Sequence, residues 1–275
     1  MKRILLSLII IAYVSTGIVS GQNAANNTSL KLEKLYARLI SNPADSVRLQ
    51  INDSIRYIIE SYATSDTVFV HRFKNLRYLG QITSPDSLLK IITWNLILKS
   101  SQSRYFCYFI RKPEDSRENK IYKLTASYKE ETIKTDTTYN EKDWYGALYY
   151  DVRTEIIDGK KCWILLGIDY GNPDITRKII DVLNITPDDS VIFGRKWFES
   201  EGKLKFRDVF EYDSNGMMSL RFKSDSSVVF DHLVPFSASQ KNDRKFYGPD
   251  YSYDAYNFTN GLWRMIINVD ARNKE

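Results

Sequence analysis

The sequence predicts an α+β fold in which an N-terminal helical hairpin packs on a large antiparallel β-sheet. Two apolar patterns at helical spacing open the chain after a polar leader, and runs of β-branched and aromatic residues follow from about residue 87. Such runs are typical of a meander, which could curl toward a barrel or a sandwich. We expect a signal peptide at 1–21, the helical hairpin at 22–64, and a β-rich domain with one inserted helix at 65–275.

The first residues have the layout of an export signal. Lys2 and Arg3 precede the apolar run "ILLSLIIIAYVSTGIV", and small and polar residues follow it. The run has roughly sixteen apolar residues, fewer than the about twenty that a membrane span needs. We therefore expect cleavage after Gly21, export to the periplasm or the outer cell surface, and no membrane span in the mature chain. An uncleaved membrane anchor is the alternative.

Two helices are predicted before residue 64. Each shows a single apolar stripe, and "SNPAD" separates them, so they most simply form an antiparallel hairpin that lies against the rest of the chain. The first stripe consists of Leu32, Leu35, Tyr36, Leu39 and Ile40, and the second of Val47, Ile51, Ile55, Ile58, Ile59 and Tyr62.

Strands are expected in nine runs of the remaining chain. Asp158-Gly159 and Asn215-Gly216 accept the positive φ of tight hairpin turns, which favours antiparallel pairing on either side of each. In 204–212, alternation places Leu204 and Phe210 on a buried face and Arg207 on a wet face with Lys203, Lys205 and Glu211. The nine runs are 88–98, 104–111, 120–128, 147–157, 160–168, 191–198, 204–212, 217–223 and 227–233.

One helix is expected to interrupt these strands. In "NPDITRKIIDVLNITPDD", the stripe of Ile175, Ile179, Val182 and Leu183 has helical spacing, and Pro187 lies beyond its end.

Composition and motifs exclude several function classes. The formal net charge is +5, and no run of five or more basic residues occurs, so nucleic-acid binding is not expected. His71 and His232 are the only histidines, and neither belongs to an HExxH motif. Neither a G-x-S-x-G elbow nor a phosphate-binding G-x-x-x-x-G-K-[ST] loop is present. The sequence predicts no metal and no cofactor.

Cys107 and Cys162 are the only cysteines. In an exported protein an even count is typical of a disulfide. Each also lies in an apolar, strand-like run, where a reduced and buried cysteine is equally ordinary. Both interpretations stay open. A Cys162-His232 catalytic pair is disfavoured because Cys162 lacks the flanking residues of the papain-like signature.

Asp231-His232 is the best remaining acid/base candidate, because a carboxylate beside an imidazole can orient it. Adjacent residues of a strand point to opposite faces, so these two side chains are not expected to touch. A histidine at a strand end that bonds to backbone is the simpler interpretation.

The stretch "YGPDYSYDAYNF", residues 247–258, is the candidate binding surface. If it is extended, Tyr251 and Tyr253 share one face while Asp250 and Asp254 share the other, and Trp263 could extend the tyrosine pair. Coplanar rings beside carboxylates suit a sugar, whose apolar face stacks while its hydroxyls find acceptors. A packed turn that closes over the core is the alternative.

Triplets of Asp, then Ser or Thr, then an aliphatic residue or Thr occur six times, for example at 45–47, 53–55 and 189–191. They resemble the O-glycosylation motif of exported Bacteroidota proteins, although Asp-Ser pairs also start helices and turns. With the export signal and phrases such as "WYGALYYD" and "DVFEYDSNGMMSLRF", the chain resembles the uncharacterised exported β-rich proteins of Bacteroidota. The resemblance implies location and broad fold, but no activity, substrate or site residue.

These observations favour an exported soluble envelope protein that binds a glycan or an envelope protein partner without catalysis. The alternative is a carboxylate-dependent hydrolase acting on an envelope or dietary polymer, because paired carboxylates leave no sequence signature. A third hypothesis is a structural subunit that docks through an exposed apolar patch on Ile51, Ile55 and Ile58.

Overall fold

The computed structural model describes residues 26–99, 102–113, 116–157 and 159–270. The predicted signal peptide, 1–21, lies outside this part of the chain. In the part that is described, none of the helices combines the length and the apolar character that crossing a membrane requires.

The N-terminal helices form one layer. Residues 26–41 are helical, α2 (Asp45–Ala63) follows after three residues, and α3 (Thr67–Val70) is a single turn. Leu32 and Ile55 are fully buried in a cluster that also contains Trp94 of the first sheet. Ile51 is 4% exposed and Ile55 is 0% exposed, so the chain's own sheet covers the face that the docking-subunit hypothesis requires to be open. The hypothesis of a structural subunit that docks through an exposed patch on Ile51, Ile55 and Ile58 is therefore wrong.

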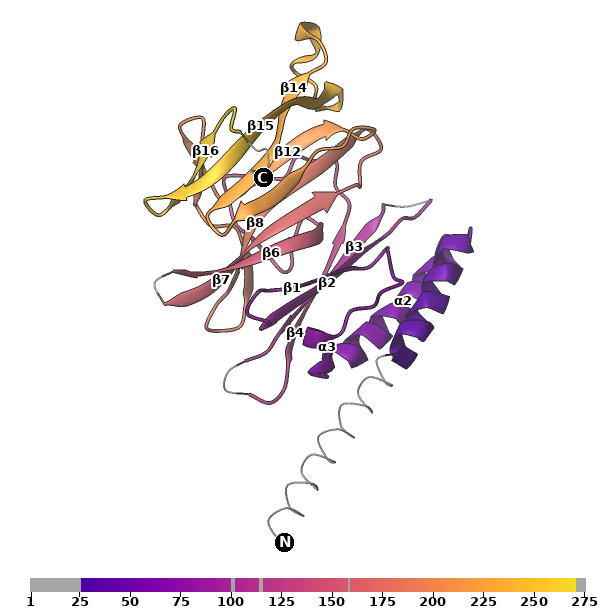
Figure 1. The fold of residues 1–275 in the computed structure, drawn as a ribbon. Helices are drawn as coiled ribbons and strands as arrows, with labels where there is room; N and C mark the ends of the chain where they lie inside the picture. Colours follow the sequence, from indigo (N-terminus) through magenta and orange to yellow (C-terminus); the bar gives the residue numbers. More distant parts are fainter. Residues whose placement is uncertain (1–25, 100–101, 114–115, 158, 271–275) are drawn as a thin grey trace.

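Three sheets follow the helices (Figure 1). The first sheet is an antiparallel meander of β1 (Gly80–Thr83), β2 (Leu89–Leu96), β3 (Arg104–Arg111) and β4 (Lys120–Ser127). The central sheet has the order β5-β9-β8-β7-β6, and β12 also pairs with β8. Its strands are β5 (Tyr139–Asn140), β6 (Leu148–Ile157), β7 (Lys160–Asp169), β8 (Ile175–Ile185), β9 (Val191–Phe193) and β12 (Asp208–Asp213).

The third sheet has the order β11-β10-β16-β15-β14-β13, and its β10-β16 pair is parallel. Two 3-10 turns, Ala238–Gln240 and Arg244–Phe246, connect β14 to β15. Its strands are β10 (Phe198–Ser200), β11 (Lys203–Lys205), β13 (Leu220–Ser224), β14 (Ser227–Pro235), β15 (Tyr247–Thr259) and β16 (Leu262–Ile266).

The alternation of side chains along β7 explains how the sheets stack. Trp163 and Leu165 point into the core shared with the first sheet, whereas Ile164 and Leu166 point into the core shared with the third sheet. Because successive strand residues face opposite sides, a strand that is apolar at every position must lie between two layers. The molecule is therefore a stack of helices, first sheet, central sheet and third sheet.

The α+β class is confirmed, with helices at the N-terminus and extensive antiparallel sheets. The β-rich part contains three stacked sheets instead of one, and within the described ranges none of them closes into a barrel.

The helix predicted at 175–183 is wrong, because this segment is strand β8. Ile179 and Leu183 are four residues apart, which places them on one face of a helix and equally on one face of a strand. Both lie in the core shared with the first sheet, and Ile180 and Val182 lie in the opposite core. A strand that is buried on both faces cannot be told from a buried helix by periodicity alone.

Three further strand predictions need correction. The run 191–198 is divided between β9 of the central sheet and β10 of the third sheet. The run 204–212 is broken into β11 and β12, and Arg207 between them is 0% exposed instead of wet. The Asn215-Gly216 segment does form a turn, since Gly216 N donates to Asp213 O at 2.9 Å. It connects two sheets, however, because β12 pairs with β8 and β13 pairs with β14.

Candidate functional site

The predicted binding stretch is strand β15, not a closing turn, and it is interrupted by a bulge. Asp231 pairs with Tyr253 and Leu233 pairs with Pro249, so residues 250–252 all face the single residue His232. Tyr251 sits at the centre of the bulge with φ 70° and with 95% of its surface exposed. A bulky residue at positive φ is a backbone outlier.

The bulge is held by its own side chains. The Asp250 carboxylate accepts hydrogen bonds from Ser252 N at 3.0 Å and from Ser252 Oγ at 2.7 Å. These hydrogen bonds, followed by the nearby His232, lower the pKa of Asp250. The local structure therefore stabilises an ionised Asp250 beside an exposed tyrosine ring.

The five residues of the predicted platform do not share one surface. Tyr251 and Asp250 are exposed and Tyr253 is half-buried, but Asp254 is 2% exposed. Trp263 is 0% exposed and lies in the core between the central and third sheets, so it cannot extend a sugar platform. The predicted face of Tyr251 and Tyr253 assumed strict alternation, which the left-handed conformation of Tyr251 interrupts.

His232 has a carboxylate partner other than the one adjacent in sequence. Its Nδ1 lies 2.7 Å from Oδ2 of Asp254 on the neighbouring strand. Asp254 Oδ1 accepts a hydrogen bond from Asn268 N at 3.0 Å, which fixes the carboxylate. Asp231 instead accepts from Ser219 N, in agreement with the expectation that it does not touch His232. A ring held through Nδ1 leaves Nε2 available to a ligand.

A cleft of about 450 Å³ adjoins this pair. Its wall combines carboxylates, cations and apolar side chains from the central sheet, the third sheet and the 132–135 segment. Phe210, Phe230, Leu233 and Met265 supply apolar surface, His232, Lys205 and Arg244 supply donors, and Asp208, Glu211, Asp231, Asp254 and Glu201 supply acceptors.

Two carboxylates of the cleft are already bonded to protein groups. Asp208 accepts from Lys205 Nζ at 2.8 Å and from the Tyr256 hydroxyl at 2.6 Å. Glu211 accepts from Arg177 Nε at 2.8 Å. Burial, and then Asp208, raise the pKa of Tyr256, so its hydroxyl remains a donor. These carboxylates are held in place as acceptors, which suits the recognition of hydroxyl groups.

Among the residues that the structure describes, no group of three or more His, Cys, Asp or Glu side chains is arranged to hold a metal ion.

The two cysteines are free thiols and do not form the disulfide that the sequence allows. Cys107 lies in the core between the first and central sheets, whereas Cys162 lies on the opposite side of the central sheet. The sheet between them prevents a bond. Burial raises the pKa of Cys107, and it raises the pKa of Cys162 to about 11, so neither thiol is a nucleophile at neutral pH.

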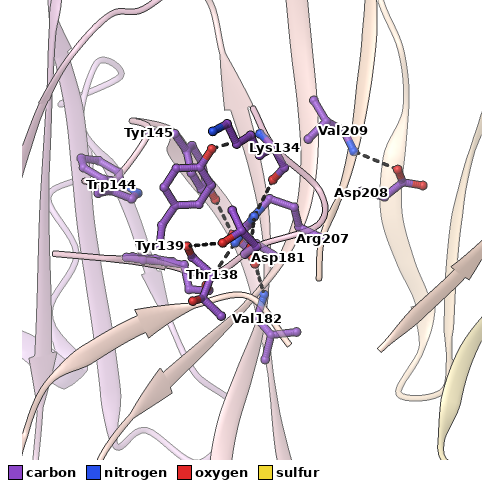
Figure 2. A network of polar contacts seen from close by, with 12 residues as sticks. Lys134, Thr138, Tyr139, Trp144, Tyr145, Asp181, Val182, Arg207, Asp208 and Val209 are labelled. Carbon is purple, nitrogen blue, oxygen red and sulfur yellow. Dashed lines mark hydrogen bonds and ion pairs between the residues drawn. The ribbon is translucent and has the colours of Figure 1, made fainter. Parts of the chain in front are cut away.

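Sequence reasoning missed a buried polar network next to the cleft (Figure 2). Arg207 donates to Asp181 and to the backbone oxygens of Lys134, Thr137 and Phe193. Tyr145 donates to the same Asp181 carboxylate at 2.8 Å. Burial lowers the pKa of Arg207, but the adjacent Asp181 outweighs it, and the pKa is raised. The network fixes the 134–138 segment on the central sheet.

Comparison of the chain with protein-family models, with curated proteins and with solved structures finds no match in any of the three. Its function is therefore inferred from the chemistry of the bulge and the cleft.

Proposed function

We propose that the protein is exported and that it binds a glycan, without transforming it, at the cleft beside the β15 bulge. The observation that carries the proposal is Tyr251, which is 95% exposed at φ 70° opposite His232. A non-glycine residue in this conformation costs about 1–3 kcal/mol, and such strain concentrates at functional sites. An exposed ring held at this cost is suited to contact a ligand.

The chemistry around Tyr251 suits a saccharide. A tyrosine ring stacks on the apolar C–H face of a pyranose, and carboxylates and imidazoles bond to the hydroxyls at its edge. Asp250 is ionised beside the ring, and Asp254 orients the imidazole of His232. The cleft, at about 450 Å³, has room for a few sugar units.

The location is part of the same proposal. The leader at 1–21 would direct export, and cleavage after Gly21 would leave Gln22 as the first residue of a periplasmic or surface protein. Intact mass spectrometry of the protein from the producing cells tests this: a chain that retains residues 1–21 contradicts cleavage. An envelope protein partner remains the other ligand class for the exposed bulge.

A carboxylate-dependent hydrolase is the second candidate, because Asp208, Glu211 and Asp254 line one cleft. Against catalysis, each carboxylate is bonded to a donor or cation, whereas a general acid is usually a carboxyl group in an apolar pocket. Release of reducing ends from a polymer, abolished by Asp208→Asn, would establish the hydrolase and reject our proposal.

A thermal-shift screen of the intact protein against envelope and dietary glycans tests the function. A ligand at one hundred times its dissociation constant adds about 2.7 kcal/mol to the free energy of unfolding. In a chain of this size that raises the midpoint by roughly 5–10 °C. We expect a shift with one sugar class. The absence of a shift with every glycan would reject glycan binding and direct the search to protein partners.

A further inference from the structure

A second cleft, of about 580 Å³, lies on the other side of the central sheet. It opens where the ends of three hairpins meet: the β3-β4 end of the first sheet, the start of β7, and the β8-β9 turn. Its wall includes Arg111, Lys112, Lys120, Lys160, Lys161 and Asp189. The cleft therefore gathers five cationic side chains against a single carboxylate.

Carboxylates outside the cleft pair with two of these cations, Lys112 with Asp66 and Lys161 with Asp86, but the other three cations are not neutralised. Arg111 Nη2 lies 3.4 Å from Asp189, and Lys120 pairs with the same carboxylate, so two cations share one negative charge. Lys160 forms no ion pair with any residue in the described part of the chain. These four side chains alone leave an excess of two positive charges, which a dianion would balance.

Two buried N–H groups of the cleft lack acceptors. Trp163 lines the cleft, is 2% exposed, and its indole Nε1 has no hydrogen-bond partner among the described residues. Arg111 Nε is also buried and has no hydrogen-bond partner among the described residues. Leaving a buried donor unsatisfied costs about 1–3 kcal/mol, and an acceptor that enters the cleft would remove that cost for both groups.

Asp189 holds the cleft in shape. It adopts φ 61°, and its carboxylate accepts from the Tyr122 hydroxyl at 3.2 Å while it pairs with Lys120 and Arg111. These contacts attach the β8-β9 turn of the central sheet to β3 and β4 of the first sheet. The cations are thus positioned before any ligand arrives, which lowers the entropic cost of binding.

We propose that this cleft binds a tetrahedral oxyanion, a phosphate or a sulfate group. The indole and guanidinium N–H groups would donate to its oxygens, and Arg111, Lys120 and Lys160 would supply the balancing charge. Charge-assisted hydrogen bonds from arginine to such oxyanions are among the strong ones. The cations line one cleft instead of following a stripe, so the site fits a single anionic group and not a nucleic-acid backbone.

The test is a titration of the intact protein with inorganic phosphate and with sulfate, at constant ionic strength maintained with chloride. The five indole N–H resonances of the ¹⁵N-labelled protein are followed by NMR, and the Trp163→Phe variant assigns the resonance of Trp163. We expect a saturable shift of that resonance. A response to chloride equal to the response to phosphate, or no response of Trp163, would overturn the proposal.

Substitutions that remove one donor or one charge from the cleft test which side chains bind the anion. Trp163→Phe keeps an aromatic ring, smaller than the indole, and removes the donor; it should weaken binding by about tenfold or more, measured by isothermal titration calorimetry because the variant lacks the reporting indole. Lys160→Gln changes an exposed residue that forms no ion pair with the described residues, so the fold should survive, and affinity should fall about three- to fivefold. Lys203→Gln, exposed on β11 and outside the cleft, is the matched control. Equal affinities of the two lysine variants would overturn the proposal.

Titrations with glucose 6-phosphate and with glucose, followed by the same Trp163 resonance, distinguish a free anion from a phosphorylated saccharide as the ligand. Tighter binding of the sugar phosphate than of inorganic phosphate identifies a phosphorylated saccharide as the ligand, and equal binding identifies the free ion. Binding of glucose with the same affinity as its phosphate would contradict the anion site. Because this cleft and the β15 bulge are lined by different residues, failure here leaves the proposed glycan site untouched.

Discussion

Arg207 Nε donates a hydrogen bond to Asp181 Oδ2 at 2.8 Å, and neither side chain has any exposed surface. The pair connects the segment before β12 to the middle of β8, and through the guanidinium it also holds the carbonyl oxygens of Lys134 and Thr137. A charge buried to this degree is tolerated only when it is paired and fully hydrogen-bonded. The central sheet and the segment beside the cleft therefore depend on this contact.

Replacing Arg207 should be strongly destabilising. Arg207→Met leaves the carboxylate of Asp181 buried without its cation, and we expect a loss of about 3–5 kcal/mol in the free energy of unfolding. Urea denaturation measures it, with Arg221→Met on an exposed position of β13 as control. The double variant Asp181→Leu/Arg207→Met should recover part of the loss. A change below about 1 kcal/mol in Arg207→Met would show that the pair does not hold the sheet.

Tyr251→Gly should stabilise the protein and abolish glycan binding. Glycine adopts φ 70° without the steric penalty of a side chain, so we expect a gain of roughly 1 kcal/mol. Tyr57→Gly is the matched control: this tyrosine is 76% exposed on α2, where glycine costs about 1 kcal/mol in a helix. Chemical denaturation should show a higher free energy of unfolding for Tyr251→Gly and a lower one for Tyr57→Gly. A loss of stability in Tyr251→Gly would argue against strain at the bulge.

Lys90 should make stability depend on pH. Its side chain is 3% exposed, its Nζ donates to His71 O at 3.3 Å and Thr83 Oγ1 at 3.1 Å, and burial lowers its pKa from 10.5 to about 8. The unfolded chain therefore binds more protons between pH 8 and 10.5, and the contribution of this group to stability rises through that window.

The difference in the free energy of unfolding between the wild type and Lys90→Met isolates the contribution of Lys90 at each pH, because the other titrating groups are common to both proteins. The wild type should gain up to about 3 kcal/mol relative to the variant between pH 7 and pH 10. Urea denaturation at each pH unit measures the difference. Parallel stability curves for the two proteins would show that Lys90 titrates normally.

Thiol titration tests the assignment of the cysteines. With Ellman's reagent, the native protein should react slowly, because Cys107 and Cys162 are 0% and 2% exposed and burial raises both pKa values. In denaturant without reductant, both cysteines should react. A denatured protein with no reactive thiol would mean that a disulfide has formed.

The fold class could be predicted because the helices and most strands each have a local signature. Ile51 and Ile55 mark a helical face, and residues 104–111 and 160–169 are strands close to where the β-branched and aromatic runs predict them. The division into three sheets could not be predicted. It depends on which strands pair across the chain, as β12 pairs with β8, and neither propensity nor alternation carries that information.

Only part of the candidate site could be predicted. The stretch around Tyr251 does contain the exposed tyrosine, but the partnership of His232 with Asp254 joins residues 22 positions apart on neighbouring strands, beside a bulge that no turn signal marks. Trp263 and Arg207 were misplaced because alternation gives only the side of a strand. Whether that side faces water depends on the neighbouring sheet.

The most direct test of the glycan site is the affinity of the glycan that gives the largest thermal shift, measured by isothermal titration calorimetry for the wild type, Tyr251→Ala and Tyr57→Ala. Tyr57→Ala should bind as the wild type does, whereas Tyr251→Ala should lose about tenfold or more in affinity, because the stacking contact of the Tyr251 ring is lost. Equal affinities of all three proteins would contradict a glycan site at the β15 bulge.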